Sequence, residues 1–338
     1  TPIKSSAASD VYKRQVHYPI NRGFSHFYGH LNGAIDYFDH MREGELDWHN
    51  DWETCYDKGY STELITQEAV RCINTYEKEG PFLLYVAYNA PHTPLQAQEK
   101  DIELYCDDFG SLTPKEQKRV TYQAMVSCMD RGIGTIVDAL KKKGIMDNTF
   151  LIFFSDNGPA GVPGSSSGKL RGRKFDEWDG GVRVPAVFYW KRAESNYKNL
   201  SSQVTGFVDI VPTLKELVGD KNRPERAYDG ISILPLLIGS TSCIDRNFYL
   251  GCGAVVNKDY KLIRKGRKPG LNLPQDFLVD YQTDPYEKKN ASNGNEQIVR
   301  SLYQVALKYD TITPCLPEIP YGKGREGFKA PVEWKVTR

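Results

Sequence analysis

Residues 150–158 read FLIFFSDNG, an unbroken apolar run followed directly by a polar turn. Such a run predicts a strand that is buried on both faces of a sheet. The segment before it, from Pro114 to about residue 140, has apolar residues at helical spacing and ends in the basic sequence KKKG at 141–144. A second apolar run, residues 82–87, precedes that helix. Strand, helix and strand in this order predict a crossover unit of a parallel sheet.

The other elements follow from the same patterns. Residues 62–78 and 212–218 predict helices, and residues 184–190 predict a further strand. After about residue 240, four short strand-like pieces and a helix predict a small antiparallel sheet with one packed helix. These pieces are residues 247–252, 254–256, 260–264, 277–280 and 297–309. We therefore expect an α/β fold, with a mostly parallel sheet between helices and a small C-terminal antiparallel sheet plus helix.

The N-terminal residues have an unusual sequence. Residues 5–15, SSAASDVYKRQ, match the conceptual translation of a sequencing adapter, so we interpret residues 1–15 as a non-native leader. We expect the natural sequence to begin near Val16, inside a longer gene. The predicted organisation is then a main α/β domain at 16–240 and a C-terminal subdomain and tail at 241–338.

The composition excludes several classes of partner. Among the 338 residues, 44 Lys and Arg nearly balance 43 Asp and Glu, so nucleic acid and anionic membranes are not favoured partners. No apolar run approaches the roughly 20 residues that span a bilayer. The seven cysteines form no CxxC pair, so no zinc cluster is expected. A disulfide between Cys243 and Cys252 is conceivable, but we expect scattered free thiols.

Polar residues follow both apolar runs. His92 lies in YNAPHTP at 88–94, and Asp156 and Asn157 follow the second run. Because ligands bind at the carboxyl ends of parallel strands, we expect these residues at one edge of one sheet. Asp and Asn together suit a hard cation such as calcium. Asp-Asn-Gly is also a common turn, and a histidine between prolines can be an ordinary loop residue.

A cation strip follows at 164–174, GSSSGKLRGRK, which contains Lys169, Arg171, Arg173 and Lys174. Four cations in six residues form either a solvated surface patch or a binding strip for an anionic substrate.

Histidines also occur nearer the N-terminus, where His26 and His30 are four residues apart. The glycines around them argue against a helix, so we do not expect this pair to bind a metal.

The motifs together carry a family resemblance. In order they are RGF at 22–24, APHTP at 90–94, SDNG at 155–158, LRGRK at 170–174, GGVRVP at 180–185, VDIVPTL at 208–214, DGIS at 229–232 and DPYE at 284–287. This series resembles the type I sulfatases of the arylsulfatase kind, in the alkaline-phosphatase-like superfamily, over residues 16–338.

The resemblance implies hydrolysis of sulfate esters, on carbohydrates or aryl alcohols, with one bound calcium ion. It implies that Asp156 and Asn157 ligate calcium and that Lys174 binds the sulfate. It also implies that His92 contacts the sulfate and protonates the leaving oxygen. Arg171, in the same cation strip, is included as a substrate-binding residue. The family suggests a periplasmic, secreted or lysosomal location, and the oligomeric state stays open.

Three family features have no counterpart in this sequence. They are an aspartate pair that completes the calcium site, a Cys-x-Pro-Ser-Arg motif whose cysteine or serine is oxidised to the formylglycine nucleophile, and a Gly-Lys-Trp-His-Leu-Gly-like stretch. Cys315-Leu316-Pro317 continues as Glu318, without Ser-Arg. We therefore expect an N-terminally truncated, inactive fragment with an incomplete calcium site and uncovered sheet surface.

Two alternatives share these residues. Relatives in the superfamily hydrolyse phosphate or phosphonate esters, usually with two metals, and an inactive pseudo-enzyme could keep the cation strip for anion binding. The identity of the missing nucleophile would distinguish these alternatives from a sulfatase.

Overall fold

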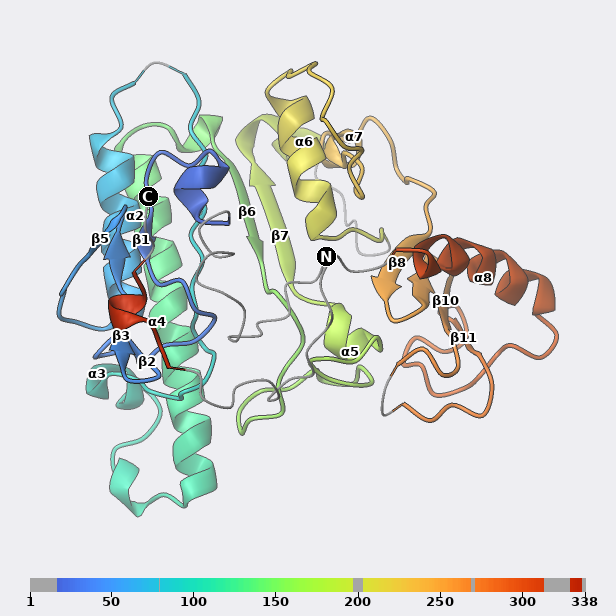
Figure 1. The fold of residues 1–338 in the computed structure, drawn as a ribbon, viewed down its shortest axis with the longest axis horizontal. Coiled ribbons are helices and arrows are strands. Elements are labelled where there is room, and N and C mark those ends of the chain that lie inside the picture. The colour runs from blue at the N-terminus through green and yellow to red at the C-terminus, as the bar shows by residue number, and fades with distance from the viewer. Residues whose placement is uncertain (1–16, 79, 197–202, 269–270, 313–328, 336–338) are drawn as a thin grey trace. The chain divides into compact units, whose positions relative to one another are not determined.

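The computed structural model describes residues 17–78, 80–196, 203–268, 271–312 and 329–335 (Figure 1). The predicted leader, residues 1–15, lies outside the described residues. The chain divides into two compact units. The first comprises Thr1–Met146, Val162–Ser165 and Leu316–Arg338, and the second comprises Asp147–Gly161 and Ser166–Cys315. The predicted boundary near residue 240 falls inside the second unit.

Two helices form the frame of the first unit, α2 (Ser61–Thr75) and α4 (Pro114–Lys142), and they pack against each other (Figure 1). A capping box fixes the start of α4, because the Thr113 amide donates to the Glu116 carboxylate over 2.9 Å and the Thr113 hydroxyl accepts from the Glu116 amide. Both predicted helices are confirmed. Their core contains Tyr37, Tyr60, Ala90, Met125 and Cys128.

The other elements of the first unit are short. They are η1 (Pro19–Arg22), β1 (Tyr28–Gly29), β2 (Met41–Arg42), β3 (Glu45–Leu46), β4 (His49–Asn50), β5 (Glu53–Thr54), α3 (Glu99–Ile102), η2 (Phe109–Ser111) and η6 (Val332–Trp334). Strands β1, β4 and β5 form one small antiparallel sheet, and β2 pairs with β3.

The second unit contains two sheets. In the smaller one, β6 (Phe150–Phe154) pairs with β7 (Ala186–Trp190). The larger one has the order β11-β10-β9-β8, with every neighbouring pair antiparallel. Its strands are β8 (Phe248–Gly251), β9 (Ala254–Val256), β10 (Tyr260–Ile263) and β11 (Phe277–Asp280). The helical elements are η3 (Met146–Asn148), α5 (Asp179–Val182), η4 (Lys191–Asn196), η5 (Phe207–Asp209), α6 (Ile210–Leu217), α7 (Leu234–Leu237) and α8 (Glu296–Asp310).

The four-stranded sheet buries both of its faces. Helix α8 covers one face, where its Leu302 and Ala306 pack against Leu262 of β10 (Figure 1). On the opposite face Trp178 packs against Ile263. Because side chains alternate along a strand, Lys261 lies on the same face as Ile263 and points toward the segment around Trp178. The predicted C-terminal antiparallel sheet with a helix packed on it is confirmed.

The predicted parallel crossover is not formed within the described residues. Residues 82–87 belong to no strand, and β6 pairs antiparallel with β7, with Phe150 opposite Trp190. An extended segment becomes a strand only where a neighbouring segment supplies the ladder hydrogen bonds. Residues 82–87 make no such hydrogen bonds with the other described residues. Side chains of this run are therefore open to solvent, with Leu83 61% and Tyr85 65% exposed. The expected uncovered sheet surface stays a prediction, because this run belongs to no described sheet.

Two expectations from composition concern the cysteines and the membrane. Within the described residues none of the six cysteines, Cys243 and Cys252 included, forms a disulfide, while Cys315 lies outside them. Among the described helices, none combines the length and apolar character needed to cross a bilayer.

The exposed apolar run predicts self-association of the purified chain. Unpaired backbone beside exposed apolar side chains favours strand pairing between molecules. We expect Leu83→Lys to lower the average mass measured by size-exclusion chromatography with light scattering. Leu104→Lys is the matched control, because Leu104 is 64% exposed but lies outside the run. A monodisperse wild-type monomer would contradict this prediction.

Buried imidazoles lie in the loop region of the first unit. His40 is 1% exposed, its Nε2 atom lies 3.0 Å from the Gly59 carbonyl oxygen, and its ring stacks on Trp48 with centroids 4.3 Å apart. Burial lowers the pKa of His40 and that of His30. Both side chains therefore stay neutral in the folded state at a pH where the unfolded chain already binds protons.

This depression of the pKa predicts loss of stability in mild acid. Unfolding takes up protons below the unfolded value of about 6.5, so the free energy of unfolding should fall as the pH drops below that value. His40→Asn removes one such group and should flatten the slope in urea titrations between about pH 7.5 and 5.5. Equal slopes for wild type and His40→Asn would refute the prediction that burial of His40 contributes to the pH dependence of stability.

Candidate functional site

The turn after β6 presents oxygen atoms to solvent. Asp156 is exposed, and one of its carboxylate oxygens accepts from the Asn157 amide over 2.9 Å. The side-chain nitrogen of Asn157 donates to the Gly158 carbonyl over 3.0 Å. Within the described residues, Oδ2 of Asp156 and Oδ1 of Asn157 make no hydrogen bond. The turn thus offers a carboxylate and an amide oxygen to a ligand.

A close backbone contact joins this turn to the segment that carries the cation strip. The Gly158 amide donates to the Gly181 carbonyl over 2.9 Å, and the Lys174 amide donates to the Pro159 carbonyl over 2.9 Å. A Cβ atom on Gly158 would lie 1.8 Å from the Gly180 carbonyl oxygen. Glycine is therefore required at position 158, and the Asp156–Asn157 turn and the Lys174 loop form one backbone cluster.

The cations of the strip have different surroundings. Lys174 is half-buried, and its ammonium lies 5.5 Å from the Phe175 ring centroid without an ion pair in the described part of the chain. Arg171 instead stacks on Trp178 at 3.6 Å and donates to the Glu287 carbonyl over 2.6 Å. The contacts of Arg171 are thus structural ones, and its contact with substrate stays a prediction. Lys174 remains available to an anion.

A buried ionic cluster lies behind this loop. The Lys261 ammonium, fully buried on β10, contacts the carboxylates of Asp179 and Glu287, the latter over 2.6 Å. A carboxylate oxygen of Glu287 accepts from the Asp179 backbone amide over 2.7 Å, and the Tyr281 hydroxyl donates to the Asp179 carboxylate over 2.8 Å. The segment 171–182 is thereby attached to the four-stranded sheet.

The two carboxylates share one lysine, and their pKa values move in opposite directions. Burial raises the pKa of Glu287, and the nearby charge of Asp179 adds to this effect. Burial also opposes ionisation of Asp179, but the positive charge and hydrogen bond of Lys261 outweigh it and lower the pKa of Asp179. This is the expected behaviour of two acids beside a single cation.

His92 lies in the first unit, on a loop anchored to its core. The His92 amide donates to the Asn89 carbonyl over 2.8 Å, and the buried Tyr37 hydroxyl lies 2.9 Å from the carbonyl oxygens of Asn89 and His92. The exposed ring has Nδ1 2.8 Å from the Thr93 carbonyl oxygen, which places the Nδ1 hydrogen there. Nε2 is left as the nitrogen that can exchange a proton with a ligand.

The structure thus brings together Asp156, Asn157 and Lys174, all in the second unit. Their convergence with His92, which belongs to the first unit, stays a prediction.

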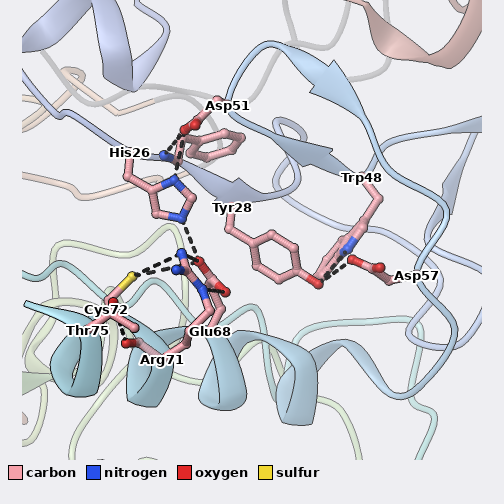
Figure 2. A network of polar contacts seen from close by, with 10 residues as sticks. His26, Tyr28, Trp48, Asp51, Asp57, Glu68, Arg71, Cys72 and Thr75 are labelled. Carbon is pink, nitrogen blue, oxygen red and sulfur yellow. Dashed lines mark hydrogen bonds and ion pairs between the residues drawn. The ribbon is translucent and has the colours of Figure 1, made fainter.

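A second polar cluster surrounds His26 (Figure 2). Its Nδ1 atom lies 2.9 Å from the Asp51 carboxylate and its Nε2 atom 2.6 Å from the Glu68 carboxylate. Glu68 also accepts from the Arg71 Nε atom over 2.8 Å, and Cys72 lies beside it on α2. Sequence reasoning missed this cluster, although Glu68 and Cys72 are four residues apart on one helix.

His26, Glu68 and Cys72 lie close enough together to contact one cation. His26 and Arg71 already contact the two carboxylates, so the polar groups of the cluster find partners among its own members. Neither His26 nor His30 lies in a helix, as expected from the surrounding glycines.

Comparison with known proteins identifies the family. Residues 5–220 match the family model described as Sulfatase. The chain belongs to the sulfatase family. The match begins inside the segment that we interpreted as a non-native leader.

Curated relatives in this family include arylsulfatases and a sugar sulfatase. Mouse Arylsulfatase J is 34% identical over 225 residues, which cover 64% of this chain and 36% of the relative. Human N-acetylgalactosamine-6-sulfatase is 28% identical over 241 residues, which cover 67% of this chain and 44% of the relative. The matched part of the chain thus spans less than half the length of these relatives.

Solved structures confirm the fold class. The crystal structure of Ps i-CgsB in complex with k-i-k-neocarrahexaose superposes with a TM-score of 0.78 at 27% identity, covering 92% of this chain and 71% of that one. BT4656 in complex with D-glucosamine-2-N,6-O-disulfate is similar in fold alone, with a TM-score of 0.59 at 16% identity, covering 85% of this chain and 77% of that one. The chain therefore has the alkaline-phosphatase-like α/β fold of sulfatases.

The glycine contact predicts a steric effect at position 158. Gly158→Ala would force its Cβ against the Gly180 carbonyl, and we expect a loss of about 1–3 kcal/mol in the free energy of unfolding measured in urea. Gly134→Ala on α4 is the control, because its Cβ would meet open space and should stabilise the helix by up to about 1 kcal/mol. An unchanged free energy of unfolding for Gly158→Ala would contradict the close packing of Gly158 against the Gly180 carbonyl.

Proposed function

We propose that the complete protein to which this chain belongs hydrolyses sulfate esters on carbohydrates or aryl alcohols. The observation that carries this proposal is the backbone cluster that holds the Asp156 and Asn157 oxygens beside the loop of Lys174. An arylsulfatase and an N-acetylgalactosamine-6-sulfatase among the relatives support both substrate classes. The oligosaccharide bound to Ps i-CgsB supports a glycan.

Calcium fits the donors on the turn after β6. It prefers carboxylate and amide oxygens, and Asp156 and Asn157 offer one of each. We propose that these residues hold the ion, with further ligands from residues that this sequence lacks. When bound, it would supply positive charge against the sulfuryl oxygens.

Lys174 and His92 are proposed to act on the substrate itself. The Lys174 ammonium would stabilise negative charge on the sulfuryl oxygens as the ester bond breaks. His92, held through Nδ1 by the Thr93 carbonyl, would deliver a proton from Nε2 to the leaving oxygen. The proposed nucleophile is a formylglycine that is not among these residues, so we propose that this chain alone does not turn over substrate.

The test compares this chain with a form extended by its upstream coding sequence. The extended form should hydrolyse 4-nitrophenyl sulfate, and the chain alone should show no turnover above an Asp156→Ala, His92→Ala control. In the extended form, His92→Ala and Lys174→Ala should each lower kcat by about 10²–10⁴.

Lys169→Ala is the matched control, because Lys169 lies in the same cation strip but contacts the Tyr286 ring at 6.0 Å. It should stay within a few-fold of wild type. Retained activity in Lys174→Ala, or a preference for phosphate esters, would sink the proposal.

A further inference from the structure

We propose that Glu287 and Lys261 are positioning residues that set the conformation of both the Lys174 loop and the Asp156–Asn157 turn. The role of Lys174 and of the turn in binding rests on the proposed function, whereas the positioning itself rests on the contacts of the second unit. Neither residue faces a ligand, so each would act through the segment 171–182.

Glu287 holds this segment at two places. Its side chain accepts from the backbone amide of Asp179, the first residue of α5, over 2.7 Å. Its backbone carbonyl accepts from the Arg171 guanidinium over 2.6 Å. Lys174 lies between these two anchors in the sequence. Fixing both ends of a short loop limits the conformations that its middle can adopt.

Lys261 favours the ionised form of Glu287 and holds its carboxylate beside the Asp179 amide. A buried carboxylate without a cation takes up a proton, and the protonated acid is a poorer acceptor. The Lys261 ammonium contacts Glu287 over 2.6 Å and also the Asp179 carboxylate. Lys261 therefore attaches the Asp179 side chain to strand β10 directly. It attaches the Asp179 backbone to the same strand through Glu287.

Helix α5 transmits this constraint to the turn after β6. The Gly181 carbonyl in α5 accepts from the Gly158 amide over 2.9 Å, and the Gly180 amide donates to the Arg171 carbonyl over 2.6 Å. Displacement of α5 would therefore move Gly158, which directly follows Asn157. The path from Glu287 to Asn157 consists of the hydrogen bond from the Asp179 amide to the Glu287 side chain, helix α5, and the backbone hydrogen bond from Gly158 to Gly181, all within one unit.

Two double variants isolate the hydrogen bond to the Asp179 amide. Lys261→Met with Glu287→Gln keeps an acceptor for this amide, whereas Lys261→Met with Glu287→Met removes it at the same charge and similar size. Both variants leave the Asp179 carboxylate with Tyr281 and Arg183 as partners, so the cost of removing Lys261 is common to the two. By hydrogen exchange, we expect the amides of Asp179, Gly181 and Gly158 to exchange about tenfold faster in the Met–Met variant. Equal exchange in the two variants would overturn the inference.

Asp310→Asn is the control for general destabilisation. It weakens the Arg264–Asp310 ion pair of 2.9 Å in the same subdomain without touching the segment 171–182. Its expected effect is a lower melting temperature with unchanged exchange at Gly158 and Gly181. Faster exchange there, as in the Met–Met variant, would show that the effect is global and would overturn the inference.

A milder pair of variants serves if the double variants do not fold. Tyr281→Phe removes the hydroxyl that donates to Asp179 over 2.8 Å, and Tyr303→Phe removes a hydroxyl 3.1 Å from Arg264. Only Tyr281→Phe should speed exchange at Gly158 and Gly181. Equal rates would count against the inference.

A separate readout tests the proposed function. Sodium sulfate should protect Lys174 of the wild-type chain from an amine-acylating reagent, as measured by peptide mass spectrometry. Absence of protection in wild type would count against Lys174 as a sulfate ligand, while the exchange results would still decide the positioning roles.

Discussion

The burial of one ammonium group, that of Lys261, is the constraint on which the second unit depends. An isolated charge in this position would be prohibitively costly; the carboxylates of Asp179 and Glu287, with the Glu177 carbonyl, make it tolerable. Breaking a buried pair of this kind typically costs about 3–5 kcal/mol. The C-terminal sheet is therefore attached to the loops of the candidate site by an interaction that tolerates little change, and it acts as part of the site rather than as an appendage.

The helices and the C-terminal sheet could be predicted because their signals are local. Apolar periodicity and the KKKG ending defined α4, and turn residues separated β8 to β11. The Asp156–Asn157 turn and Lys174 were likewise predicted from short motifs. The ionic cluster was not, because Lys261 lies 82 residues from Asp179 and 26 from Glu287. A lysine inside the strand sequence YKLI, 260–263, was the available signal, since an ammonium on a buried strand needs a carboxylate.

Strand pairing was the least predictable part of the fold. The runs 82–87 and 150–154 are both apolar and aromatic-rich, yet within the described residues only the second forms a ladder, with β7. Composition indicates that a segment suits a sheet, whereas its neighbour and direction depend on residues distant in sequence. His92 has the same limitation: its loop could be recognised from the motif, whereas its convergence with Asp156 stays a prediction.

The contact of Gly158 with Gly180 also bears on how the substrate range of such a protein could be altered. A backbone that is packed against backbone has no side chain to vary, so the turn and helix α5 are poor targets for a mutational library. Diversity introduced into the Gly- and Ser-rich segment 164–168 would leave that contact intact. New specificity is thus more accessible at the N-terminal end of the cation strip than in the backbone that supports it.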